Sequence, residues 1–111
     1  MRDQPKPPEA YEHFIATHPH LKTAWEAIAE AGKQGPIDER TQRLLKLAIA
    51  AGAMREGAVR SSARKALAMG ITPEEIRQVV ALAAGVLGLP STVAVHTWLR
   101  GVTAAEPERD T

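Results

Sequence analysis

Apolar residues recur at helical spacing along almost the whole of this 111-residue chain. They are separated mostly by three or four positions, which places them on one face of an α-helix. No segment alternates apolar and polar residues over a length that would indicate a β-strand. The pattern therefore predicts an all-α fold of about six helices.

The clearest helix boundary lies around residues 70–75. Gly70 follows a helical pattern and suits a left-handed C-terminal cap. Thr72, Pro73 and Glu75 then supply an N-cap, a first helical residue and a capping box. Asp38 is a second plausible N-cap. The predicted helices cover about 9–16, 19–31, 39–53, a fourth segment ending at 69, a fifth beginning at 73 and a sixth through 95–102.

The two ends of the chain differ in composition from its centre. Residues 1–8 carry three prolines and three charges, and we expect them and residues 105–111 to be tails. One helical domain over 9–104 remains. Only 4% of the residues are aromatic, so close helix packing must fill the core, and oligomerisation would help so small a core. Leu21, Trp25 and Ile28 stand at core spacing in the second helix.

Composition excludes several classes of function. The chain has no cysteine, which excludes disulfides, thiolate metal sites and thiol nucleophiles within it. The 14 basic and 13 acidic residues balance, so no nucleic-acid partner is expected. No signal peptide or membrane span is expected, and we predict a cytoplasmic protein without a membrane partner. His13, His18 and His20 lack a completing ligand set, so neither a metal nor another cofactor is expected.

Three stretches carry a resemblance to a known family. They are "HPHLKTAWEAIAEAG", "GPIDERTQRLLKLAIAAG" and "ARKALAMGITPEEIRQVVALAAGVLGLPS". The last is the most specific, because it combines Ala66-x-x-x-Gly70, the capping box and a later Gly-x-Pro. From about Tyr11 to Val102 the chain resembles the carboxymuconolactone decarboxylase family, which includes the AhpD-like alkylhydroperoxidases. The resemblance implies an all-helical subunit that forms homotrimers or homohexamers, with sites near subunit boundaries.

The resemblance also assigns the positions of the family's catalytic groups. In the peroxidase branch a Glu on the long helix is followed by Cys-x-x-Cys-x-x-x-His, and these positions fall on Arg43, Arg55, Ala58 and Ser62. All four are replaced, so no thiol peroxidase chemistry carries over. The decarboxylase branch reads Arg-Glu-x-Glu-x-x-x-His. Arg55 and Glu56 match its beginning, whereas Ala58 and Ser62 do not match its acid and its histidine.

Arg43 and Arg55 are the candidate ligand-binding residues. Arg55 shares a helix face with Ser62, and Arg43 on the preceding antiparallel helix could approach it. Two guanidinium groups would favour an anion, and the guanidinium fork suits a carboxylate. The alternative is that both arginines are solvated, or pair with Glu39, Glu56 or a neighbouring subunit.

Glu56, Ser62 and His96 are the candidate catalytic residues. Ser62 could orient a ligand, although no histidine adjoins it in sequence to act as a base. His96, one turn before Arg100, could be a general acid or base, or a structural or surface histidine. Glu56 is the best-placed carboxylate for proton transfer, and an ion pair with Arg60 is the alternative.

Together these observations predict a carboxymuconolactone decarboxylase-like protein without thiol peroxidase activity. It would act on or bind a small organic acid or lactone in a pocket at a subunit boundary, and a lyase is the enzymatic form of this prediction. One alternative is an oligomeric scaffold or binding module without catalysis. The other is an AhpD-like alkylhydroperoxidase role, which the family favours and the absence of cysteine opposes.

Overall fold

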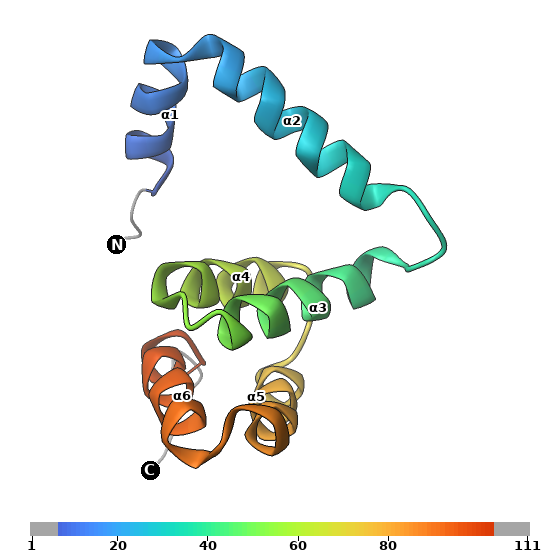
Figure 1. Ribbon diagram of the computed structural model, residues 1–111, viewed down its shortest axis with the longest axis vertical. Helices are drawn as coiled ribbons and strands as arrows, with labels where there is room; N and C mark the ends of the chain where they lie inside the picture. Colours follow the sequence, from blue (N-terminus) through green and yellow to red (C-terminus); the bar gives the residue numbers. More distant parts are fainter. Residues whose placement is uncertain (1–6, 104–111) are drawn as a thin grey trace. The chain divides into compact units, whose positions relative to one another are not determined.

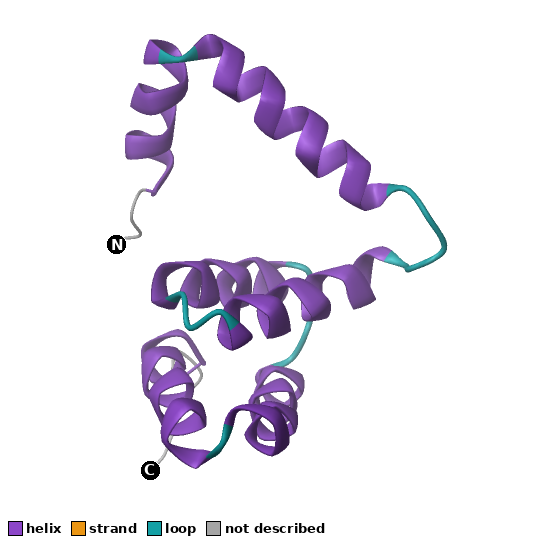
Figure 2. Cartoon of the chain, in the orientation of Figure 1, coloured by secondary structure: helices purple, strands orange, loops and turns teal. Residues whose placement is uncertain are grey.

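The computed structural model describes residues 7–103, and all regular secondary structure in that range is helical (Figure 2). The six helices labelled in Figure 1 are α1 (Pro7–Thr17), α2 (Pro19–Lys33), α3 (Glu39–Gly52), α4 (Glu56–Ala68), α5 (Pro73–Leu87) and α6 (Leu89–Thr103). The all-α prediction is confirmed. The predicted tails fall largely outside the described residues, although α1 begins at Pro7, two residues before the predicted start.

The contacts within the chain divide it into two compact units. The first unit ends at Pro36 and contains α1 and α2, and the second begins at Ile37 and contains α3–α6. In the second unit α3 packs against α4 and α5, and α6 packs against the same two helices. All four helices contribute to one core. Its buried apolar residues are Leu47, Ala50, Ala51, Val59, Ala63, Ala66, Ile71, Ile76, Val80, Val95 and Leu99.

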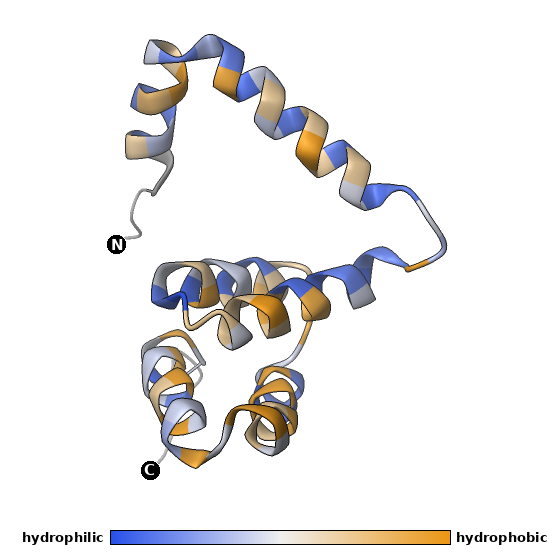
Figure 3. Cartoon of the chain, viewed as in Figure 1, coloured by the Kyte–Doolittle hydropathy of each residue, from blue (hydrophilic) through white to orange (hydrophobic). Residues whose placement is uncertain are grey.

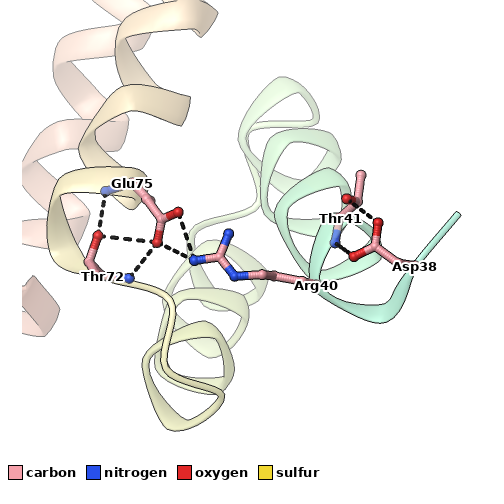
Figure 4. Close-up of polar contacts among 5 residues, drawn as sticks. All are labelled: Asp38, Arg40, Thr41, Thr72 and Glu75. Atoms are coloured by element: carbon pink, nitrogen blue, oxygen red, sulfur yellow. Dashed lines mark hydrogen bonds and ion pairs between the residues drawn. The ribbon is translucent and has the colours of Figure 1, made fainter.

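Local capping fixes the start of α3 and of α5 (Figure 4). The Asp38 carboxylate accepts a hydrogen bond from the backbone N–H of Thr41 at 3.2 Å, which confirms the predicted N-cap. The Thr72 hydroxyl accepts from the N–H of Glu75 at 3.1 Å, and the Glu75 carboxylate accepts from the N–H of Thr72 at 2.9 Å. This is the predicted capping box. Arg40 also donates to both Glu75 oxygens, at 2.5 and 2.7 Å, and so ties α3 to α5.

Gly70 ends α4 in the way the sequence predicts. Its φ angle is +95°, in the range that favours glycine. The N–H of Gly70 donates to the Leu67 carbonyl and the N–H of Ile71 donates to the Ala66 carbonyl, both at 3.0 Å. These two bonds form a Schellman motif, which satisfies carbonyl groups at the helix end. Ala66 and Ile71 are both buried in the core.

The apolar face of α2 is exposed within its own unit. Leu21, Trp25 and Ile28 stand at core spacing, but they are 49%, 57% and 63% exposed there, and no residue of α2 is buried. Figure 3 shows apolar residues on this helix as well as on α3–α6. Helical spacing shows which face of a helix is apolar without showing what covers it, so the burial of these three residues stays a prediction.

Candidate functional site

Arg43 and Ser62 lie together between α3 and α4. The Nη1 of Arg43 donates to the Ser62 hydroxyl oxygen over a long 3.5 Å. Ser62 is buried, and the Nε of Arg43 is buried with no hydrogen-bond partner among the described residues. The predicted approach of Arg43 to the Ser62 face of α4 is therefore present. A buried guanidinium N–H without an acceptor is costly, because it has lost its hydration.

Two lysines add positive charge to this place. Lys46 lies one turn after Arg43 on α3, and Lys65 lies one turn after Ser62 on α4. Burial lowers the pKa of Lys65, and the positive charges of Arg43 and Lys46 lower it further. The charged groups that act on Lys65 are thus both cations. We call Arg43, Lys46, Ser62 and Lys65 the α3–α4 cluster.

Carboxylates do not neutralise the arginines that the sequence singled out. In the part of the chain that the structure describes, no ion pair joins Arg43 or Arg55 to an acidic side chain. Arg55 is the N-cap residue of α4 and is exposed, and its side chain makes no capping hydrogen bond. Ser62 lies two turns further along α4, roughly 10 Å along the axis. The amides at the start of α4 are therefore about two turns away from Ser62.

Glu56 and His96 lie away from the α3–α4 cluster. The carboxylate of Glu56 pairs with Arg60 one turn later on α4, at 2.6 Å, which is the alternative that the sequence left open. His96 is exposed and lines a separate groove between α5 and α6. Of the five candidate residues, the structure brings together Arg43 and Ser62.

Sequence reasoning missed Lys46 and Lys65 as members of this cluster. From the sequence alone, Lys65 is interpreted as one of three solvated basic residues on α4, together with Arg60 and Arg64. Its spacing of three residues from Ser62, like that of Lys46 from Arg43, was the available signal. The signal is weak, since only the packing of α3 on α4 makes the two helix faces meet.

Residues 7–103 show neither a metal-ligand group nor a membrane-crossing helix. In this range no three His, Asp or Glu side chains are grouped in a way that could hold a metal ion. None of the helices there has both the length and the apolar character that a membrane crossing needs.

Comparison with known proteins gives one match. No curated protein and no solved structure matches the chain. The model of the carboxymuconolactone decarboxylase family matches residues 19–101, which include α2–α5 and nearly all of α6. This match covers well over half of the sequence and agrees with the all-helical fold. The chain therefore belongs to the carboxymuconolactone decarboxylase family.

Proposed function

We propose that the chain binds a small organic acid at the α3–α4 cluster, without thiol chemistry. The observation that carries this proposal is the buried Nε of Arg43, which lacks an acceptor beside a hydroxyl and two further cations. A carboxylate supplies what these groups lack. It accepts hydrogen bonds from a guanidinium and a hydroxyl, and it neutralises neighbouring ammonium groups.

Lys65 is the group best suited to proton transfer in such a complex. Burial and the neighbouring cations Arg43 and Lys46 lower its pKa, and a lysine is one of the side chains that can act as a general base. Ser62 orients the acid in this proposal, because its hydroxyl lies beside the Arg43 guanidinium that would bind the carboxylate. If the chain catalyses a decarboxylase-type reaction, we propose that Lys65 transfers the proton to or from a bound acid or lactone. Thiol peroxidase activity is not proposed, since the chain has no cysteine.

A thermal-shift screen against small monocarboxylates, dicarboxylates and lactones tests the binding. A ligand at a hundred times its Kd stabilises the native state by about 2.7 kcal/mol. For a domain of this size that corresponds to a rise in Tm of roughly 10 °C or more. Arg43→Met should abolish the shift. Arg64→Met is the matched control, because it removes an exposed guanidinium two residues from Ser62, on another face of α4. A shift that survives Arg43→Met, or no shift with any compound, contradicts the proposal.

Self-association is a second part of the proposed function, supported by the uncovered face of α2. Leu21, Trp25 and Ile28 repeat at helical spacing and remain exposed within their own unit. We propose that a second copy of the chain covers them in a homotrimer or homohexamer, as the family resemblance implies. Light scattering should give a multiple of the 12.0 kDa chain mass. Trp25→Lys should reduce that mass, whereas Thr23→Lys, on the polar side of α2, should not.

The scaffold alternative makes a distinct prediction from the same two experiments. A stable oligomer that responds to no acid or lactone would be an assembly module that lacks a ligand site. An oligomer with a shift lost in Arg43→Met would be a binding protein or an enzyme.

A further inference from the structure

The second unit contains a groove that the α3–α4 cluster does not use. It lies between α5 and α6, which pack against each other in Figure 1, and has a volume of about 400 Å³. Pockets that hold small ligands are typically about 300–1,000 Å³, so this one suits a small molecule. Ile76, Val80 and Leu99 are buried in the core and contribute to its lining.

Most polar groups of this α5–α6 groove already have partners inside their own helix. The Thr92 hydroxyl donates to the Gly88 carbonyl at 2.8 Å, and the Thr103 hydroxyl donates to the Leu99 carbonyl at 3.0 Å. A ligand would therefore meet mainly His96 and Arg100 on α6, both with exposed side chains. Arg77 on α5 also lines the groove and already has an interaction of its own.

His96 and Arg100 place two hydrogen-bond donors at the rim of the groove. They are four residues apart, so they lie one above the other on the same face of α6. None of the described residues that line the groove is acidic. An apolar lining beside the Arg100 guanidinium and the His96 imidazole matches a molecule with an apolar body and an anionic end.

We propose that the α5–α6 groove binds a small amphipathic carboxylic acid. The apolar body lies against Ile76, Val80 and Leu99, and the carboxylate accepts hydrogen bonds from Arg100 and His96. An inorganic anion would leave the apolar lining unused, and a neutral hydrocarbon would leave the charges unused. This site goes beyond the function proposed for the α3–α4 cluster and does not depend on it.

Calorimetry with straight-chain acids tests the proposal. Acetate, hexanoate and octanoate keep the carboxylate and vary the apolar body, and 1-hexanol keeps the body without the charge. We expect the Kd to fall several-fold with each added methylene pair, and hexanol to bind more weakly than hexanoate. Equal affinity for acetate and octanoate, or for hexanol and hexanoate, overturns the proposal.

Two surface variants locate the binding. Arg100→Gln should weaken hexanoate about tenfold or more, the usual range for losing a hydrogen bond to a charged group. Val93→Asp should also weaken it, because Val93 lines the groove, is 51% exposed and would bring a repelling charge without disturbing the core. Arg64→Gln is the control for loss of a surface arginine and should change nothing.

Two results would assign the acid or the groove differently. Hexanoate binding that is lost in Arg43→Met and kept in both groove variants would place the acid at the α3–α4 cluster and overturn the inference. An absence of acid binding, combined with a lower oligomer mass in Val93→Asp, would identify the groove as a subunit contact and overturn it as well.

Discussion

Replacing Arg43 with methionine should make the ligand-free protein more stable. The buried Nε of Arg43 has no acceptor, and an unsatisfied buried polar group costs about 1–3 kcal/mol. Methionine keeps an unbranched side chain with a helix propensity close to that of arginine, so α3 itself should be unaffected. The change also removes a positive charge that acts on Lys65.

The loss that opposes this gain is small. The hydrogen bond from Nη1 to Ser62 is 3.5 Å long, at the weak end of the range, and ordinary bonds contribute only about 0.5–1.5 kcal/mol. The net effect should be about 1 kcal/mol in favour of the variant, or a rise in Tm of about 4–8 °C. Arginine at this position is therefore expected to weaken the fold in return for binding an anion, as functional groups often do.

Urea denaturation of both proteins in Tris chloride, without phosphate or carboxylate, measures this difference. A second readout is the pKa of Lys65, which should rise in Arg43→Met because one neighbouring cation is gone. A variant that is 1 kcal/mol or more less stable than the parent would refute the reasoning, since Arg43 would then be a structural residue with a satisfied environment. An unchanged Lys65 pKa would show that the two side chains do not interact.

Four further predictions test the fold. Gly70→Ala should lower the unfolding free energy by about 1–2 kcal/mol, because φ is +95° there, although no atom would crowd the new Cβ. Gly85→Ala, in the open interior of α5, should raise the unfolding free energy by about 0.5–1 kcal/mol. Urea denaturation measures both changes. The hydrogen bond from Arg40, and after it the hydrogen bond from the N–H of Thr72, lower the pKa of Glu75 from 4.5 to about 2. Stability from this carboxylate is therefore present above pH 4.5 and lost as the pH falls toward 2. Glu75→Gln should reduce the acid sensitivity of Tm in that window, and unchanged sensitivity would contradict the pairing. Leu47→Ala, at a site only 1% exposed, should cost about 2–5 kcal/mol by calorimetry.

Helix boundaries were the most predictable part of this fold because their causes are local. Asp38 caps α3 through Thr41, and Thr72 caps α5 through Glu75, each over three residues. Such signals can be read without knowing the tertiary structure. Burial was less predictable. Val86 follows Val79 by two helical turns and so lies on the apolar face of α5, but it is 84% exposed, because the spacing of a helix does not show how wide its covered face will be.

The candidate site was only partly predictable for a related reason. The approach of Arg43 to Ser62 follows from two consecutive antiparallel helices, which the sequence does indicate. The placement of His96 in another groove depends on how α6 is rotated against α4 and α5, and no sequence signal reports that rotation. The same holds for Lys65, whose electrostatic environment arises from the opposite helix.

The structure explains what the Ala66-x-x-x-Gly70 spacing does in this fold. Ala66 is fully buried within the core, and Gly70 has a positive φ in the motif that ends α4. Both requirements arise from packing and helix termination, and neither involves positions 55, 58 or 62. The Ala66-x-x-x-Gly70 pattern therefore reports the fold of α4, whereas Arg43, Ser62 and Lys65 set the chemistry beside it. Gly70→Ala should accordingly lower the stability of the fold and leave the carboxylate affinity of the folded fraction unchanged. Arg43→Met should raise the stability and abolish the carboxylate affinity. A Gly70 variant that folds fully but loses its ligand would show that the signature and the site are coupled.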